Sequence, residues 1–328
     1  MKKLIVGVIA VAAVVAILAI VLLRPSQQVI PPADIKIGVL RHESSLPIYI
    51  ADELGLFAKA GLSAKLVEVP PGDHMPALIS KRVDILSPTS FPVLFGVMLK
   101  NPGLLYAVFP GAEIADGSTV YGFIVSKQSN ASTIEDLRKK VVMAINPYTK
   151  MNIQAILSSA EMPREDWPEI KVAAREAALK AISDGYADAA IMDQPALAVA
   201  VASGDYKILE ANPRAKHIGS PYWSGSGAVL SRHWQDNEES FTRLMTAIDD
   251  ALAEIERDPQ KAHRILAKRL GLDQSIADQM GGYYFPKSTD SVDMSGIEAT
   301  VHALVEAGLL EKPISMDGFF PPHTYGTL

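Results

Sequence analysis

Strand-like and helix-like segments alternate along this chain from residue 35 onward, and this alternation limits the folds open to it. The segment 35–40 is an apolar run with the length of a strand, and Ser45 and Pro47 then supply an N-cap and a first-turn proline for a helix. The same order of strand, break and helix returns at 62–79 and again from residue 83. Strands that are apolar throughout are typical of sheets buried between helices. The chain is therefore predicted to have an α/β fold with mainly parallel sheets flanked by helices.

Polar residues follow several of the predicted strands, at the edge where open sheets of this kind bind ligands. The strands end at Leu40, Val69, Leu86 and Ala144. Helices are predicted to begin in the segments that follow, and helix N-termini present free amide groups that favour an anion or another hydrogen-bond acceptor. We therefore expect a ligand site here, with the candidates Arg41, His42, Glu43, Ser44, Ser45, Thr89, Ser90, Asn146, Tyr148, Thr149 and Lys150.

Each candidate also has a purely structural interpretation. Ser45 and Thr89 can serve as N-caps without contacting a ligand. Arg41 can pair with Glu43 at the surface or, like Lys150, supply the formal charge that an anionic ligand needs. Three aromatic side chains can either stack on a planar ligand or wall the hinge of a cleft: Tyr148, Tyr222 and Trp223.

An uninterrupted apolar run of 20 residues, 4–23, follows Lys2 and Lys3. A helix needs ~20 residues to span a bilayer, whereas the apolar region of a signal peptide has ~7 to 15. The nearby Ala-x-Ala sequence at 10–12 lies inside the run. The segment 1–24 is predicted to be an uncleaved membrane anchor, with a cleaved signal sequence as the alternative. By the positive-inside rule, the rest of the chain lies in the periplasm or an equivalent extracytoplasmic space, anchored to the inner membrane.

The amino-acid composition limits the binding partners and the kinds of chemical site that this protein can have. The chain has no cysteine, which excludes disulfides, thiolate metal sites and the lipid-bearing cysteine of a lipoprotein. Its net charge of -6 argues against a nucleic-acid partner. The 7 histidines show no metal-ligand spacing, and neither a G-x-S-x-G nor a phosphate-loop motif occurs. We expect that the protein is not an enzyme and that it has no catalytic residue, no metal site and no cofactor. The segment 25–34 is predicted to be a short linker.

Several segments resemble one protein family, and they occur in the family's order. The helix after the first strand carries Ala51, Glu53, Gly55 and Phe57, in the family's Ala-x-Glu-x-Gly-x-Phe spacing, and the segment 82–85 resembles its G-x-V-D-I without the glycine. Further similar segments are 132–144, 182–198 and 305–315. Over nearly all of its length after the linker, the chain resembles the periplasmic substrate-binding proteins of ABC transporters of the sulfonate, nitrate and taurine type, which are related to the thiamine-pyrimidine synthase-like domain.

The resemblance implies a type II periplasmic binding protein fold, in which two lobes joined by two crossovers close on a ligand in the cleft. On this basis the lobes are expected at 35–121 plus 230–328 and at 122–229. The resemblance also places Asp193 and Gln194, which follow a buried strand, in the pocket. The implied function is capture of a small-molecule solute by a monomer and its delivery to the permease of an ABC importer.

Two departures from the family's pattern bear on the ligand. Sulfonate-type members often have glycine and serine in the loop after the second-lobe strand, whereas residues 146–150 are bulkier and contain no glycine. Glu43 would repel an anion unless Arg41 compensates its charge. The ligand is thus left open between an anion and an aromatic, heterocyclic or otherwise apolar solute. A thiamine-pyrimidine synthase-type enzyme is the rival function, although such enzymes carry a cysteine-rich motif. A ligand-sensing lobe for a membrane partner is a third possibility.

Overall fold

The computed structural model describes residues 33–280 and 282–326, which belong to one compact unit with two five-stranded sheets. The strands of the first sheet are β1 (Ala33–Val39), β2 (Leu62–Glu68), β3 (Ile85–Ser90), β4 (Leu105–Glu113) and β10 (Tyr222–Leu230). Those of the second are β5 (Tyr121–Ser126), β6 (Val141–Ala144), β7 (Glu169–Val172), β8 (Ala189–Asp193) and β9 (Tyr206–Ala211). The strand orders are β2-β1-β3-β10-β4 and β7-β6-β8-β5-β9.

Both sheets are mixed: in each, four of the five strands run in one direction, in line with the expected mainly parallel sheets, and one strand runs against them. In the first sheet β1 runs parallel to β2 and β3, whereas β10 runs antiparallel to β3 and β4. In the second sheet β6 is parallel to β7 and β8, whereas β5 is antiparallel to β8 and β9. A crossover helix forces parallel pairing only between the strands that it joins. β5 is the first strand after the chain crosses to the second sheet, and β10 is the first strand after it returns to the first sheet. Because neither strand follows a crossover helix within its own sheet, both can pair in the antiparallel sense.

Alternate residues of the second sheet pack into two separate hydrophobic cores. Phe123 and Val142 belong to one core, and their chain neighbours Ile124 and Met143 belong to the other. This arrangement follows because successive side chains of a strand point to opposite faces of the sheet. Burial of each such side chain stabilises the fold by ~1.5–3 kcal/mol relative to exposure. The apolar strands of the sequence are thus explained by helices on both faces.

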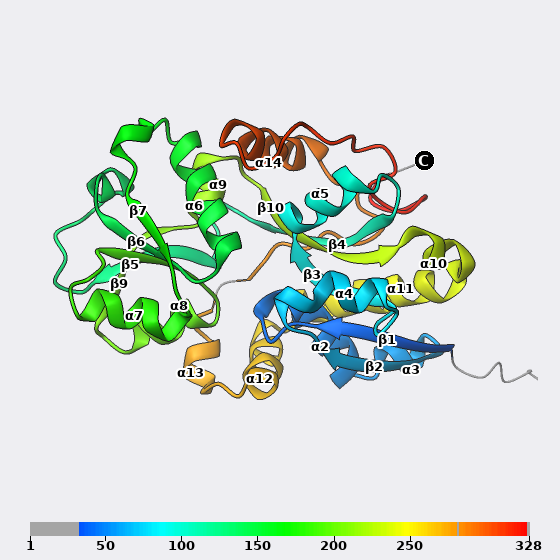
Figure 1. Ribbon diagram of the computed structural model, residues 1–328. Coiled ribbons are helices and arrows are strands. Elements are labelled where there is room, and N and C mark those ends of the chain that lie inside the picture. The colour runs from blue at the N-terminus through cyan, green and yellow to red at the C-terminus, as the bar shows by residue number, and fades with distance from the viewer. Residues whose placement is uncertain (1–32, 281, 327–328) are drawn as a thin grey trace, which may run out of the picture. The chain divides into compact units, whose positions relative to one another are not determined.

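Helices lie around both sheets (Figure 1). Before β5 and after β10 the chain forms α2 (Leu46–Glu53), α3 (Leu56–Lys59), α4 (His74–Ile79), α5 (Phe91–Lys100), α10 (Ser231–Asp236), α11 (Glu238–Arg257), α12 (Pro259–Leu270), α13 (Gln274–Ala277) and α14 (Met294–Glu306). Between β5 and β10 it forms α6 (Pro147–Ser159), α7 (Arg175–Ser183), α8 (Ala196–Ala202) and α9 (Pro213–His217). The 3₁₀ turns are η1 (Glu43–Ser45), η2 (Pro71–Asp73), η3 (Ile134–Leu137) and η4 (Arg164–Asp166).

The chain passes between the sheets twice, and Asn212 joins the two passages. One passage leads from β4 to β5 and the other from β9 to β10. The buried side chain of Asn212 accepts a hydrogen bond from the Val120 amide at 3.1 Å. It also donates to the carbonyl oxygens of Ile114 at 3.0 Å and Ser118 at 3.1 Å. Because an unpaired buried amide costs ~1–3 kcal/mol, these bonds hold the two passages side by side.

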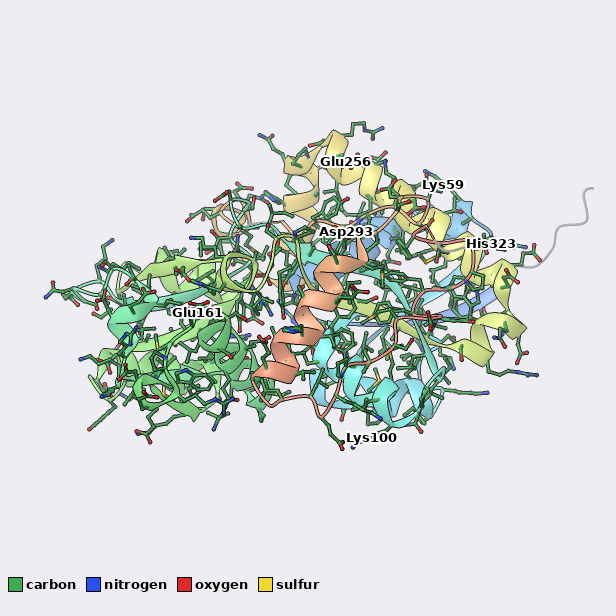
Figure 2. The ribbon with its side chains drawn as sticks, turned by 90° about the horizontal axis from the view of Figure 1, so that it is seen from above. Lys59, Lys100, Glu161, Glu256, Asp293 and His323 are labelled. Atoms are coloured by element: carbon green, nitrogen blue, oxygen red, sulfur yellow. The ribbon has the colours of Figure 1, made fainter. Side chains whose placement is uncertain are left out.

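α14 provides a further tie between the two sheets, and Figure 2 shows it crossing the region between their elements. Asp293 caps the helix by accepting a hydrogen bond from the Ser295 amide at 2.9 Å. The helix contacts both α6 and β10. At its C-terminal end, Arg164 of η4 donates to the carbonyl oxygens of Glu306 and Ala307, each at 3.4 Å. The C-terminal helix therefore contacts β10 of the first sheet and also α6 and η4, which belong to the part of the chain that forms the second sheet.

Sheet membership moves the expected division of the chain. Tyr121 lies in β5 of the second sheet, and residues 222–229 lie in β10 of the first, so the chain changes sheets before residue 121 and before residue 222. The expected anchor at 1–24 lies outside the described residues, as does the expected linker up to residue 32, whereas Ala33 and Asp34 already form part of β1. In the described part of the chain, no helix has the length and apolar character that crossing a membrane requires.

Gly225 of β10 is pressed against β3, and a matched pair of glycine substitutions tests this contact. A Cβ atom at Gly225 would lie 2.3 Å from the carbonyl oxygen of Thr89, so Gly225→Ala must displace the backbone. We expect it to lower the free energy of unfolding by about 1–3 kcal/mol. Gly96 lies inside α5 with no atom within 4 Å of an added Cβ, and Gly96→Ala should raise the free energy of unfolding by about 0.5–1 kcal/mol. Urea unfolding measures both changes, and effects of the same sign would contradict the close approach of β10 to β3.

Candidate ligand-binding cavity

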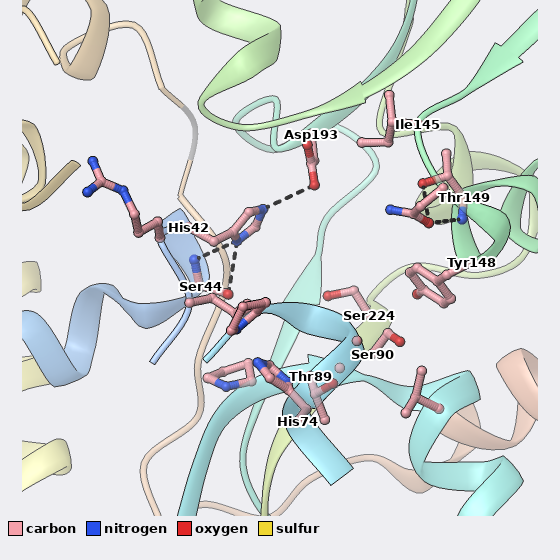
Figure 3. A pocket seen from close by; sticks show the side chains of 18 of the residues that line it. His42, Ser44, His74, Thr89, Ser90, Ile145, Tyr148, Thr149, Asp193 and Ser224 are labelled. Carbon is pink, nitrogen blue, oxygen red and sulfur yellow. Dashed lines mark hydrogen bonds and ion pairs between the residues drawn. The ribbon is translucent and has the colours of Figure 1, made fainter. Parts of the chain in front are cut away.

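A cavity of about 730 Å³ lies between the two sheets and is lined from both (Figure 3). The first sheet contributes the segments that follow β1, β2 and β3, and the second contributes the segment after β6 and the end of β8. In Figure 3, Tyr148 and Ile145 lie on one side, across from Ser90 and Ser224. Cavities of ~300–1,000 Å³ are typical of sites for small molecules. The carboxyl ends of strands from both sheets therefore surround one space of suitable size.

Most of the residues predicted from the sequence line this cavity: Arg41, His42, Ser44, Thr89, Ser90, Asn146, Tyr148, Thr149 and Asp193. They lie at the ends of four different strands or in the segments that follow, and the fold brings them together. The prediction rested on the rule that ligands bind beyond the carboxyl ends of strands, and the cavity lies at those ends.

The other predicted residues lie outside the lining: Glu43, Ser45, Lys150, Gln194, Tyr222 and Trp223. Ser45 is buried below the loop, where its Oγ accepts a hydrogen bond from the Leu40 amide at 3.2 Å. Glu43 is only 2% exposed, and burial raises the pKa of its carboxyl well above the usual value. Its charged form is therefore disfavoured, which weakens the repulsion that was expected between Glu43 and an anionic ligand.

Structural contacts account for most of the remaining side chains outside the lining. Gln194 donates to the carbonyl oxygen of Thr119 at 2.9 Å and accepts from the Ala198 amide at 3.1 Å. Trp223 is buried against α14, where an added Cβ at Gly296 would meet its ring at 2.8 Å. Lys150 follows Thr149 on α6 and is not among the residues that line the cavity.

His42 and Asp193 face each other across the cavity. His42 Nε2 lies 3.5 Å from Asp193 Oδ2, although the first residue follows β1 and the second ends β8. On the other side of the imidazole, Nδ1 accepts a hydrogen bond from the Ser44 amide at 3.1 Å and lies 2.9 Å from Ser44 Oγ. An amide N–H needs a lone pair on its acceptor, so Nε2 is the ring nitrogen that can donate to the carboxylate. His42 thereby links the two sides of the cavity.

Asp193 is held in its charged form. Burial by itself would raise the pKa of this carboxyl, but the hydrogen bond and charge of His42, together with Arg175, outweigh burial and lower the pKa to about 2. Arg175 Nη2 donates to Asp193 Oδ1 at 3.1 Å. The guanidinium group of Arg175 is therefore already paired within the protein.

A buried ion pair lies beside the cavity at the passage between the sheets. Arg214 of α9 donates to Glu113 at the end of β4, and both side chains are almost completely buried. Burial raises the pKa of Glu113, and the nearby Arg214 offsets only part of that rise. The Arg214 guanidinium also lies 3.7 Å from the ring centroid of Tyr121. Arg214 and Tyr121 both line the cavity.

Sequence reasoning missed several lining residues, among them His74, Tyr121, Arg175, Arg214 and Tyr283. Three of them follow strands that run in one direction within their sheet: His74 follows β2, Arg175 follows β7 and Arg214 follows β9. The rule that ligands bind beyond the carboxyl ends of strands pointed to the segment of His74, and it applies equally to the other two segments. Tyr283 follows no strand of either sheet, so nothing in the sequence singled it out.

The expected free amide groups at helix starts are largely occupied. At η1 the Ser44 amide donates to the His42 ring. At α6 the Thr149 amide donates to Asn146 Oδ1 at 2.7 Å, and Pro147 has no amide hydrogen. Two of the three expected helix starts thus have amide groups that are already bonded within the protein, whereas Ser90 at the start of α5 makes no side-chain capping hydrogen bond. Among residues 33–280 and 282–326 no cluster of three or more carboxylate and imidazole side chains is arranged to hold a metal ion.

Comparisons with known proteins agree with this geometry. The family model described as NMT1/THI5 like matches residues 42–262. No curated protein matches the chain. Among solved structures, the periplasmic aliphatic sulphonate binding protein SsuA from Escherichia coli superposes with a TM-score of 0.71 at 17% identity, over 90% of this chain and 94% of its own. The nitrate-binding protein NrtA from Synechocystis PCC 6803 gives 0.64 at 14% identity, over 88% and 84%.

An enzyme has the same fold. The desulfurization enzyme DSZB superposes with a TM-score of 0.65 at 15% identity, over 88% of this chain and 96% of its own. At such low identity these structures establish the fold of the described residues, a periplasmic-binding-protein fold, and leave the chemistry to the residues of the site.

The charge of Asp193 should be visible in the pH dependence of stability. Because its pKa is lower in the folded chain than the usual ~3.9, the stabilisation is present above pH ~4 and is lost as the pH falls towards 2. We expect Asp193→Asn to cost about 1–2 kcal/mol at pH 7 and progressively less below pH 4, measured by chemical unfolding. Asp184→Asn, which removes an exposed carboxylate paired with Lys180, is the control and should cost under about 0.5 kcal/mol. A pH-independent loss at Asp193 would contradict the assigned charge pairing.

Proposed function

The chain belongs to the NMT1/THI5-like family, and on that premise we propose that it is the extracytoplasmic solute-binding protein of an ABC importer. It captures a small molecule in the cavity between the sheets and presents it to a membrane permease. The observation that carries this proposal is the cavity itself, which is lined from both sheets and spanned by the contact between His42 and Asp193.

A ligand in this position would touch both sides of the molecule at once. Such a ligand favours the conformation in which the two sides approach, because only there does it make all its contacts. The two passages of chain beside Asn212 are the natural hinge, since they connect the sheets directly. Ligand binding thereby stabilises one conformation, and a permease can recognise that conformation.

The two lobes of this proposal follow the sheets. One comprises residues 33–113 and 222–326, and the other comprises residues 121–211, with the passages between them. These bounds replace 121 and 230 because β5 and β10 belong to different sheets.

A second candidate function is enzymatic, and one observation favours it. Ser44 Oγ, the His42 ring and Asp193 form a continuous chain of contacts at 2.9 Å and 3.5 Å, an order of groups that can activate a serine. Against it, the Ser44 amide shares the same ring nitrogen, so these contacts also close the local cap of η1. The binding function is therefore preferred, and the fate of a bound solute distinguishes the two.

Solute binding is tested by ligand-dependent melting of the full-length protein in detergent, against a broad panel of charged and uncharged small molecules. A ligand at a hundredfold excess over its dissociation constant stabilises the native state by ~2.7 kcal/mol, which raises the melting temperature by several degrees. No shift with any solute would contradict the proposed function. A solute recovered chemically altered, by mass spectrometry, would favour the enzymatic alternative.

The same assay locates the site. Tyr148→Ala should weaken binding about tenfold or more, because the ring forms one wall of the cavity. Lys150→Ala, two residues further along α6 and outside the lining, is the matched control and should leave the affinity unchanged.

The proposal also includes an uncleaved N-terminal membrane anchor at residues 1–24, supported by the 20-residue apolar run and the flanking lysines. We expect the expressed chain to remain in the membrane pellet after carbonate extraction and to retain its N-terminal residues by mass spectrometry. Release into the supernatant as a shortened chain would show instead that the segment is a cleaved signal sequence.

A further inference from the structure

We infer that the cavity takes a solute with two hydrogen-bonding groups: an acceptor oxygen for the hydroxyl groups of Tyr121 and Tyr148, and an N–H or O–H group that donates to Nδ1 of His74. This inference rests on the proposed solute-binding function and names the chemical class of its ligand. It follows from the buried polar atoms of the lining residues that the protein itself leaves without a hydrogen bond.

Unpaired polar atoms are concentrated at the cavity. In the described residues, eleven buried side-chain nitrogen and oxygen atoms have no hydrogen-bond partner. Five of them belong to residues that line the cavity: His74 Nδ1, Tyr121 Oη, Tyr148 Oη, Arg175 Nε and Arg214 Nε. Folded proteins leave few buried polar groups unpaired, because each such group costs stability. Their accumulation around one space is expected where a ligand supplies the missing partners.

Two of these atoms are hydroxyl oxygens of tyrosines in the part of the chain that forms the second sheet. Tyr121 begins β5, and Tyr148 lies in the first turn of α6. Burial raises the pKa of Tyr121 well above the usual value, although the nearby Arg214 lowers it in part, so this hydroxyl keeps its proton. A phenolic hydroxyl is a better donor than acceptor, because its oxygen lone pair is delocalised into the ring. An acceptor oxygen of the ligand therefore suits both tyrosines.

His74 has the opposite need and lies on the side of the first sheet. It follows β2 at the start of α4 and is only 1% exposed. Its Nε2 lies 3.2 Å from the carbonyl oxygen of Val69, which can only accept, so Nε2 carries the ring hydrogen. Burial lowers the pKa of His74, which disfavours a second proton on the ring. Nδ1 is thus an unpaired acceptor, and an N–H or O–H group of the ligand can complete it.

One ligand can serve both sides of the cavity. Tyr148 and His74 follow strands of different sheets, and Figure 3 shows them apart in the lining. The cavity of about 730 Å³ has room for a molecule that extends from one to the other. Apolar side chains in the same lining suit the body that carries the two groups, among them Val69, Val93 and Ile145. Hydroxy and amino derivatives of carboxylic acids or amides have this combination of groups.

Removal of single hydroxyl groups tests whether they are unpaired. We expect Tyr121→Phe and Tyr148→Phe to leave the melting temperature of the ligand-free, full-length protein in detergent unchanged or higher, because neither variant breaks a hydrogen bond. Tyr206→Phe is the matched control and should lower the melting temperature, since Tyr206 Oη donates to the carbonyl oxygen of Leu179 at 3.0 Å. A decrease of equal size in all three variants would overturn the inference.

Compounds that differ by methylation test the ligand class by calorimetry on the same preparation at pH 7. The broad panel includes 4-hydroxybenzoate with 4-methoxybenzoate and 4-hydroxybenzamide with 4-methoxybenzamide, and every other solute that binds is compared with its O- or N-methylated form. We expect the form with the free O–H or N–H to bind about tenfold or more tightly. The acid and amide pairs distinguish a carboxylate from a neutral carbonyl as the acceptor.

The outcomes separate the ligand class from the binding function. A ligand that lacks either group, or that binds equally well after methylation, would overturn the ligand class and leave the binding function standing. Absence of binding by every compound would overturn both.

Variants of the lining assign the two groups of the ligand to their partners. His74→Phe keeps a ring and removes Nδ1, so it should abolish the preference for the unmethylated form. Tyr148→Phe should weaken both members of each pair to the same degree, because methylation leaves the acceptor oxygen intact. His302→Ala, on the exposed surface of α14 and outside the lining, is the control and should leave the preference unchanged. A preference that persists in folded His74→Phe would overturn the role of His74, and if that variant does not fold, the compound pairs on the unaltered chain decide the ligand class.

Discussion

The ion pair between Glu113 and Arg214 lies where the chain crosses from one sheet to the other. Glu113 ends the last strand before the first passage, and Arg214 lies in the helix before the return. Each charge is buried, so neither is tolerable alone, and removing one partner of such a pair typically costs ~3–5 kcal/mol. Together with the hydrogen bonds of Asn212, the pair requires the two passages to stay adjacent. The placement of both sheets around one cavity depends on that adjacency.

The same electrostatic constraint shapes the cavity. Low-polarity surroundings make an unpaired charge expensive, and the chain meets this cost by pairing Arg175 with Asp193 and Arg214 with Glu113. Asp193 illustrates the outcome, because burial alone would favour its neutral form while His42 and Arg175 hold it ionised.

The fold is shared with proteins whose names record sulphonate and nitrate binding and with a desulfurization enzyme. Such breadth is expected when a scaffold presents loops from many strands to a single space, since the loops can change while the sheets persist. In this chain the loop before α6 carries an asparagine cap and a proline in the first turn of the helix.

Local pattern in the sequence determined much of this protein. Alternation of apolar runs with turn residues predicted several of the strands, and the rule that ligands bind beyond the carboxyl ends of strands pointed to several of the residues that line the cavity. These predictions succeed because each depends on residues that are close to one another in the chain. The tertiary structure alone decided that the sheets are mixed and that Trp223 packs as core. It also brought Arg214 to Glu113, 101 residues away, and Arg175 to Asp193. Ion pairs and strand pairs form between residues that are far apart in the sequence. A pattern along the sequence carries no information on the distance between such residues in space.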